Sequence, residues 1–228
     1  NLSLGTAGSP GISTSTRQKI NTAVNNGILV VCSGGNDGLT APAAARETDD
    51  PGRAAMALTV VAASDSNQLT DYSSQGFGSP SLVAGQEEDY KPDLMAPGGS
   101  SFQTAILAAD SNSADRNAFP DQQTDDYWAT QGTSFAAPFA AGAGALVIEA
   151  LQQSGVIWDF NSAQHPILVK MLLCATASES NQNREGNLNN PTLQRAAAGT
   201  NGFPLGKDQY EGYGMINPDA AVEAVAQL

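Results

Sequence analysis

The stretch from Thr133 to Gln153 constrains the fold more than any other part of the chain. It consists almost entirely of alanine, glycine and a few large apolar residues, so a helix formed here has no polar face to turn toward water. We therefore predict a central helix that is buried all round, and we expect Gly142 and Gly144 to let its neighbours pack closely. A chain of 228 residues is long enough to form one domain around such a core.

Short apolar runs elsewhere have the composition of strands in a parallel sheet. Residues 28–32 and 58–63 are continuous and rich in β-branched side chains, which is typical of strands buried on both faces. Alternation of such strands with helices favours a layered α/β domain. We predict strands at 1–5, 28–32, 58–63 and 94–96, helices at 13–26, 133–153, 166–177 and 217–228, a strand pair at 101–109 and 126–130 around an acidic loop, and a polar excursion at 178–210.

The composition excludes several classes of function. Ten Lys and Arg against 23 Asp and Glu give a net charge of −13, which disfavours a nucleic-acid partner. No run of 18 apolar residues occurs, so we expect no membrane span. Cys32 and Cys174 each lie in an apolar run and are expected to be buried thiols.

The segment Gly132-Thr133-Ser134 opens the small-residue helix. A serine at this position has unpaired backbone N–H groups and the positive end of the helix dipole beside it, which would stabilise an oxyanion on a bound carbonyl. The alternative is an ordinary serine cap on a core helix. The pattern G-x-S-x-G is missing here, which disfavours an α/β-hydrolase.

The segment Ser33-Gly34-Gly35-Asn36-Asp37-Gly38 follows a predicted buried strand directly. Its glycines would allow a peptide backbone to lie against the loop, and the Asn36 amide is a neutral donor at a rigid strand end. A simple turn explains the same residue types. A nucleotide site is disfavoured because the segment has neither G-x-G-x-x-G nor a lysine-bearing phosphate loop.

Taken in order, five segments resemble the subtilisin-like serine proteases. They are residues 1–5 (NLSLG), 30–38 (VVCSGGNDG), 94–98 (LMAPG), 132–138 (GTSFAAP) and 212–217 (GYGMIN). The resemblance implies a three-layer α/β/α fold with a mostly parallel sheet, and residues 1–228 would be the C-terminal portion of a peptidase catalytic domain. Phe139 stands where the family usually has histidine, a change that we expect to affect packing only.

The same resemblance implies a serine endopeptidase acting on peptides or proteins. Ser134 would be the nucleophile, and the Asn36 side chain with the Ser134 N–H would form the oxyanion hole. Ser3, Leu4 and Gly5 would pair with the substrate backbone by β-augmentation. The segment Ser33-Gly34-Gly35 would form one wall of the pocket for the residue before the cleaved bond.

The family's remaining catalytic residues, an aspartate and a histidine, should precede Asn1. The single histidine, His165, follows Ser134 by 31 residues and is expected to be a surface residue ahead of Pro166. Without a base, a serine hydroxyl is a poor nucleophile. We therefore expect an upstream part of the domain to supply both groups, this chain alone being inactive. The alternative is a non-catalytic module that binds peptides or pairs with another chain.

Two acidic segments suggest further expectations. Asp49, in Thr48-Asp49-Asp50, lies where family members place the floor of the specificity pocket, and would favour lysine or arginine; an ordinary turn at Asp50-Pro51-Gly52 is the alternative. We expect no required cofactor and no metal-binding residues in the site. Calcium remains an alternative in the acidic loop, through side chains such as Asp110, Asn112, Asp115, Asp121, Asp125 and Asp126. Only four of the ten cations are lysine, which is typical of many secreted proteins and favours an extracellular location.

Overall fold

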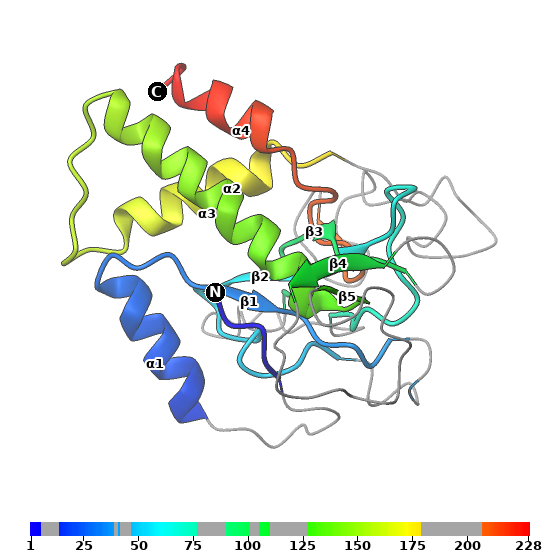
Figure 1. The fold of residues 1–228 in the computed structure, drawn as a ribbon. Helices are drawn as coiled ribbons and strands as arrows, with labels where there is room; N and C mark the ends of the chain where they lie inside the picture. Colours follow the sequence, from blue (N-terminus) through cyan, green and yellow to red (C-terminus); the bar gives the residue numbers. More distant parts are fainter. Residues whose placement is uncertain are drawn as a thin grey trace.

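The computed structural model describes residues 1–5, 14–38, 41, 47–76, 90–100, 105–109, 127–178 and 207–228 (Figure 1). Within them the elements are α1 (Thr14–Asn25), β1 (Val31–Ser33), β2 (Leu58–Ala63), β3 (Leu94–Pro97), β4 (Ile106–Ala109), β5 (Tyr127–Thr130), α2 (Thr133–Gln153), α3 (Gln164–Ala175) and α4 (Pro218–Val225). The acidic loop at 110–126, with the calcium ligands considered above, lies outside the described residues, as do residues 179–206 of the polar excursion.

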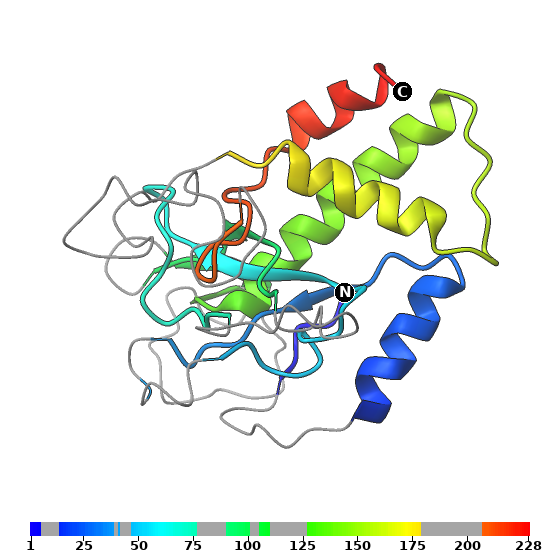
Figure 2. The ribbon, with the colours of Figure 1, turned by 180° about the vertical axis from the view of Figure 1, so that it is seen from behind.

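The central sheet is parallel, with the strand order β1-β2-β3. Every residue of β2 is buried, as expected for a strand covered on both faces. The strand predicted at 1–5 is wrong, because only Leu2 of this segment pairs, in an isolated bridge. The strand predicted at 28–32 is present as β1 but starts only at Val31, and the side chain of Ile28 is 51% exposed. Leu2 pairs in parallel with Cys32, so the N-terminus lies beside β1 near the middle of the molecule (Figures 1 and 2).

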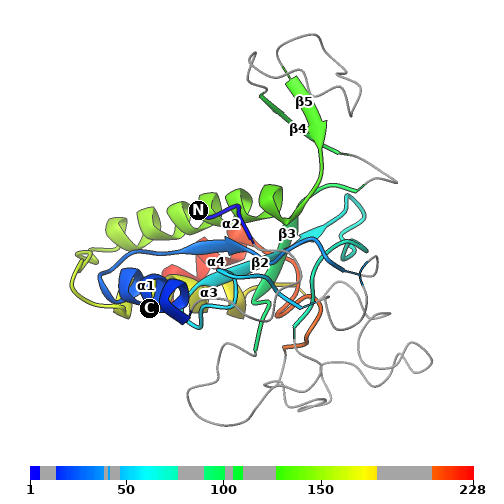
Figure 3. The same cartoon turned by 90° about the horizontal axis from the view of Figure 1, so that it is seen from below.

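Helices cover both faces of this sheet, as Figure 3 shows. Helix α2 packs across all three strands on one face. On the other face, Ile20 and Val24 of α1 pack against Val30 and Cys32. Helices α3 and α4 pack against α2 and against each other. The predicted α/β fold with a mostly parallel sheet is confirmed.

Helix α2 has the predicted bounds, but its burial is one-sided. Its buried side chains form a stripe at helical spacing that includes Ala136, Ala140 and Val147, whereas Phe139 is 48% and Leu146 is 51% exposed. By length and composition alone, α2 could cross a membrane; here its buried stripe packs on the sheet, α3 and α4. The prediction of a helix buried all round is therefore wrong for this chain.

The two glycines of α2 also lie on different sides of the helix, one buried and one exposed. A Cβ atom on Gly144 would lie 2.5 Å from Cδ2 of Leu29, so this glycine does allow close packing of α2 beside β1. A Cβ atom on Gly142 would meet nothing within 4 Å. The expectation of close packing is thus correct at Gly144 and wrong at Gly142, which lies on the exposed side.

The predicted strand pair before α2 is also present within the described residues, and residues 101–104 and 126 of the prediction lie outside them. Strands β4 and β5 are antiparallel, with Ile106 opposite Thr130 and Ala109 opposite Tyr127. Figure 3 shows this hairpin projecting away from the central sheet. Its outer side chains, Leu107 and Tyr127, are about half exposed.

A buried charge cluster fixes β3 to α3 and to the C-terminal segment. The Asp93 carboxylate pairs with the Nζ atoms of Lys91 at 2.8 Å, Lys170 at 3.0 Å and Lys207 at 2.8 Å. Asp93 also accepts the N–H of Thr59 at 2.8 Å. Three cations around one carboxylate hold the pKa of Asp93 well below its usual value, against the effect of burial.

Candidate active site

The first turn of α2 is tied to the loop after β1 through the side chain of Asn36. Its Oδ1 accepts the N–H of Thr133 at 2.9 Å and the Thr133 hydroxyl at 3.0 Å. The Thr133 hydroxyl oxygen in turn accepts the N–H of Gly35 at 3.1 Å. Asn36 therefore satisfies one of the unpaired donors at the helix N-terminus from a distant part of the chain. Sequence reasoning missed Thr133, although its place between Gly132 and Ser134 was a signal.

This contact brings Asn36 and Ser134 together. Because Oδ1 accepts from Thr133, the amide nitrogen Nδ2 remains a donor. A Cβ atom on Gly132 would lie 3.6 Å from Nδ2 of Asn36 and 3.8 Å from the backbone nitrogen of Ser134. Both nitrogens thus border the space beside Gly132, whose φ of 150° also suits glycine. An oxyanion in that space could accept from both donors.

The loop after β3 holds the start of α2 from the other side. The carbonyl of Gly98 accepts the N–H of Gly132 at 2.9 Å and the hydroxyl of Tyr72 at 2.9 Å. Burial raises the pKa of Tyr72 to about 12, so this hydroxyl remains a donor near neutral pH. The position of Ser134 is therefore fixed by backbone contacts from β3 and by Asn36 from β1.

The N-terminal segment, residues 1–5, reaches the same place. Leu2 donates to the carbonyl of Val31 at 2.8 Å, and its own carbonyl accepts the N–H of Ser33 at 3.1 Å. The hydroxyl of Ser3 donates to the carbonyl of Ser134 at 2.7 Å. Leu4 and Gly5 follow and are exposed, with the carbonyl of Leu4 accepting the Ser33 hydroxyl at 3.3 Å.

Asp49 lies against both of these segments. Its N–H donates to the carbonyl of Gly34 at 2.9 Å. Its carboxylate oxygen Oδ2 lies 3.0 Å from where a Cβ on Gly5 would stand, and 2.6 Å from where a Cβ on Gly35 would stand. Burial, followed by the charges of Asp37 and Asp50, raises the pKa of Asp49 to about 7. The structure thus gathers Ser3, Leu4, Gly5, Ser33, Gly34, Gly35, Asn36, Asp49 and Ser134 into one region.

The single histidine is elsewhere and is engaged. Nδ1 of His165 accepts the N–H of Asp159 at 2.9 Å, and its ring lies 5.2 Å from the ring of Trp158. These residues lie after the C-terminal end of α2, whereas Ser134 lies in its first turn. The only histidine of the 228 residues is therefore not a partner of Ser134 in the described part of the chain.

Metal binding has no support in the described residues. Among them, no three His, Cys, Asp or Glu side chains are grouped closely enough to hold an ion. Asp50 is engaged by Arg17, whose Nε and Nη2 donate to its two carboxylate oxygens at 2.6 and 2.8 Å. The site therefore consists of a serine hydroxyl, backbone and amide donors, and the carboxylate of Asp49.

Comparison with known proteins agrees with this arrangement. Residues 1–214 match the family described as the Subtilase family. Over 147 residues, or 64% of the chain, the sequence is 32% identical to "Subtilisin BL" of Lederbergia lenta, and equally similar to an "Alkaline protease" of Alkalihalobacillus alcalophilus. The matched region is 40% of the first protein and 28% of the second, so the chain spans well under half of these curated relatives.

Solved structures share the fold. A lanthipeptide protease superposes with a TM-score of 0.67 at 23% identity, over 98% of this chain and 60% of that one. The prenylagaramide maturation protease PagA superposes with a TM-score of 0.65 at 22% identity, over 99% of this chain and 61% of that one. About two fifths of each solved chain therefore has no counterpart in these 228 residues.

Proposed function

This chain belongs to the subtilase family, and we propose that it is the part of a serine endopeptidase domain that carries the nucleophile and the oxyanion hole. The observation that carries the proposal is the Asn36 side chain, which joins the loop after β1 to the first turn of α2 beside Ser134. The substrates are peptides or proteins.

In the proposed reaction, the Ser134 hydroxyl attacks the carbonyl carbon of a peptide bond. A histidine outside these 228 residues takes the hydroxyl proton, and an aspartate orients that histidine. The negative charge on the carbonyl oxygen is stabilised by Nδ2 of Asn36 and the N–H of Ser134. The histidine then gives its proton to the leaving amine, and water hydrolyses the acyl-enzyme.

The substrate would bind along two segments that border this serine. Ser3, Leu4 and Gly5 offer backbone groups on an exposed segment, and an extended peptide could pair there. The segment Ser33-Gly34-Gly35 would form the facing wall, since the N–H of Gly35 is held by Thr133 beside the nucleophile.

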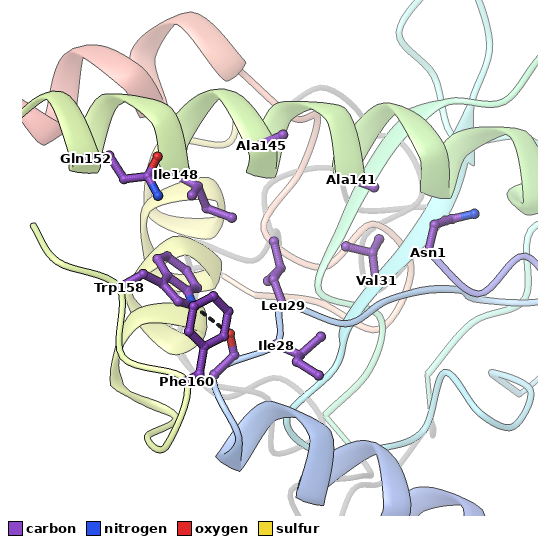
Figure 4. A pocket seen from close by; sticks show the side chains of 11 residues that line it. Asn1, Ile28, Leu29, Val31, Ala141, Ala145, Ile148, Gln152, Trp158 and Phe160 are labelled. Atoms are coloured by element: carbon purple, nitrogen blue, oxygen red, sulfur yellow. Dashed lines mark hydrogen bonds between the residues drawn. The ribbon is translucent and has the colours of Figure 1, made fainter.

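An apolar groove supports the proposal that a further segment packs on this chain. Figure 4 shows Ala141, Ala145 and Ile148 of α2 facing Leu29 and Val31, with Trp158 and Phe160 at one end. The groove has a volume of about 340 Å³, and its lining is mostly apolar. Nε1 of Trp158 donates to the carbonyl of Gly27 at 2.8 Å, which fixes its indole ring.

The groove lies where a further segment of the proposed peptidase domain could pack close to Ser134. Its lining includes Asn1, which starts the N-terminal segment whose Ser3 contacts Ser134. A segment seated here could bury Ile28 and Phe160, which are 51% and 66% exposed, and approach the catalytic serine. About two fifths of each related solved chain lies outside the part that this chain matches, enough for such a segment.

Active-site labelling tests the proposal. A fluorophosphonate probe should label the full-length protein at Ser134, and Ser134→Ala should abolish the labelling. The isolated 228-residue polypeptide should label at least 100-fold more slowly, because it has no base for the hydroxyl. Rapid labelling of that polypeptide would contradict the need for a further segment.

A second candidate function is a non-catalytic module that binds peptides or pairs with another chain. It is favoured by one observation, the engagement of the only histidine with Asp159 and Trp158. The two functions differ in the labelling experiment, because a module without a base gives a full-length protein that the probe labels no faster than Ser134→Ala.

We also propose that the protein acts outside the cell, without a required cofactor, and binds neither nucleic acid nor membranes. The net charge of −13 supports the exclusion of nucleic acid, and the low lysine content supports an extracellular location. Detection of the protein in the culture medium of its source would support the extracellular location. Activity unchanged by a chelator would support the absence of a required metal cofactor.

A further inference from the structure

Tyr72 joins the two loops that carry the proposed oxyanion donors, and the proposed reaction does not use it. Its backbone carbonyl accepts the N–H of Gly38, two residues after Asn36, at 2.9 Å. Its hydroxyl oxygen lies 2.9 Å from the carbonyl oxygen of Gly98 and 2.7 Å from that of Gly99. One residue is thus bonded to the loop after β1 by its backbone and to the loop after β3 by its side chain.

The loop after β3 begins with two glycines, so no side chain of its own holds it there. Glycine has the greatest backbone freedom of all residues, and the φ of Gly99, 79°, is one that favours glycine. The N–H of Gly98 donates to the carbonyl of Ala63 at 2.9 Å, which fixes the beginning of the loop. The Tyr72 hydroxyl fixes the two carbonyls that follow.

This loop in turn holds the start of α2. The carbonyl of Gly98 accepts the N–H of Gly132, the residue before α2, at 2.9 Å. Burial raises the pKa of Tyr72, and hydrogen bonds with the Thr70 side chain and the Gly132 backbone oppose this rise. The hydroxyl therefore lies beside Gly132, at the edge of the space that Asn36 and the Ser134 N–H border.

The segment that contains Tyr72 also holds the loop after β1 on both sides of Asn36. The N–H of Ser74 donates to the carbonyl of Gly35 at 3.0 Å, and the Ser74 hydroxyl accepts the N–H of Asp37 at 3.1 Å. Residues 72–74 are thus a common support for the two chain segments that supply the donors.

We propose that the Tyr72 hydroxyl positions the oxyanion hole by setting the distance between Nδ2 of Asn36 and the backbone nitrogen of Ser134. The proposal rests on the proposed function, since both donors belong to it. Their spacing matters most in the transition state, because negative charge develops on the carbonyl oxygen only as the serine attacks. Loss of the hydroxyl should therefore lower the turnover number kcat and leave the Michaelis constant KM nearly unchanged.

Substitution of the hydroxyl alone tests the proposal. Tyr72→Phe keeps the ring, which packs against the main core cluster. In the full-length protein it should lower kcat for peptide hydrolysis about tenfold and change KM less than twofold. Tyr213→Phe, which removes a hydroxyl from a half-buried tyrosine beside Lys207, is the matched control and should change neither constant. A kcat of Tyr72→Phe within twofold of the native value would overturn the proposal.

A double substitution separates positioning of the donors from other effects of the hydroxyl. In the Asn36→Asp protein one donor is absent, so the distance between the two donors no longer matters. Adding Tyr72→Phe to this protein should therefore lower kcat by less than twofold. A tenfold loss in both backgrounds would mean that the hydroxyl acts on another step, and the proposal would be wrong.

Hydrogen exchange gives a readout that does not require catalysis. In full-length Tyr72→Phe, deuterium uptake by residues 131–134 should be at least fivefold faster than in the native protein, because the carbonyl that accepts the Gly132 N–H is less firmly held. Tyr213→Phe should exchange at the native rate. Faster exchange in a protein that cleaves no peptide would mean that the contact stands and the proposed function fails. Unchanged exchange in Tyr72→Phe would overturn the role of Tyr72 whether or not the protein cleaves peptides.

Discussion

The Oδ1 atom of Asn36 accepts the backbone N–H of Thr133, 97 residues later in the chain, at 2.9 Å. One side chain thereby caps the N-terminus of α2 through its oxygen and keeps its nitrogen for the space beside Gly132. Folding of the helix start and assembly of the candidate oxyanion hole thus depend on the same amide group.

The two roles of Asn36 can be separated by substitution. Asn36→Asp keeps an acceptor for Thr133 but removes the donor, so peptidase turnover of the full-length protein should fall by about 10²- to 10³-fold, the loss known from subtilisin for such a donor. The melting temperature should change little. Asn36→Leu should lower both turnover and melting temperature. Unchanged turnover in Asn36→Asp would exclude the amide from catalysis.

The two glycines of α2 should respond in opposite ways to the same substitution. In the 228-residue chain, Gly142→Ala should stabilise the fold by about 0.5–1 kcal/mol, because alanine favours helix and the new methyl group meets no neighbour. Gly144→Ala should be about 1–2 kcal/mol less stable than Gly142→Ala, because the methyl group would collide with Leu29. Urea unfolding measures both. Equal effects would mean that the exposed side of α2 is covered.

The buried amine of Lys91 should make stability depend on pH. Burial, reinforced by the charges of Lys170 and Lys207, lowers its pKa to about 7, although Asp93 opposes this shift. Between pH 7 and 9 the unfolded chain therefore holds a proton that the folded chain does not, so the free energy of unfolding should rise with pH.

Lys91→Met should remove this dependence. The difference in unfolding free energy between native protein and variant should shift by about 1–2 kcal/mol between pH 7 and 9, in favour of the native protein at the higher pH. Lys19→Met, on the exposed face of α1, is the matched control and should show no such shift. A pH-independent difference would show that Lys91 stays protonated throughout.

The two cysteines should be unreactive in the native protein. Cys32 is fully buried and Cys174 is 8% exposed, and burial raises the pKa of each thiol to about 11. Ellman's reagent at pH 8 should therefore label neither thiol within minutes, and both after unfolding in guanidinium chloride. Fast reaction of one thiol without denaturant would indicate local opening of its segment. The sequence prediction of two buried thiols is confirmed by the structure.

Much of the fold followed from local patterns. The bounds of α2 and β2 agree with the apolar composition of their segments, because strands and helices buried on at least one side must be apolar there. Which sides of α2 are buried could not be predicted from its composition. Composition shows that a helix can be buried all round, but only the packing shows that the side with Gly142 and Leu146 faces open space.

The candidate site was predictable in its residues but not in its contacts. The resemblance indicated Ser134 and Asn36. The hydrogen bond that brings them together, however, runs from the N–H of Thr133 to Asn36, and no local sequence pattern predicts a contact between residues 97 positions apart. The cluster of Lys91, Lys170 and Lys207 around Asp93 was not predicted, since its members are dispersed from β3 to the C-terminal segment. The roles of Ser134 and Asn36 in catalysis, and of Asp49 in specificity, stay predictions.

The groove beside α2 has a practical consequence for preparing this polypeptide. With Ile28, Phe160 and much of α2 exposed to water, the 228 residues expressed by themselves should self-associate at the concentrations used for crystallography. A mild detergent during purification should keep the preparation monodisperse. Co-expression with the further segment proposed above should make such an additive unnecessary.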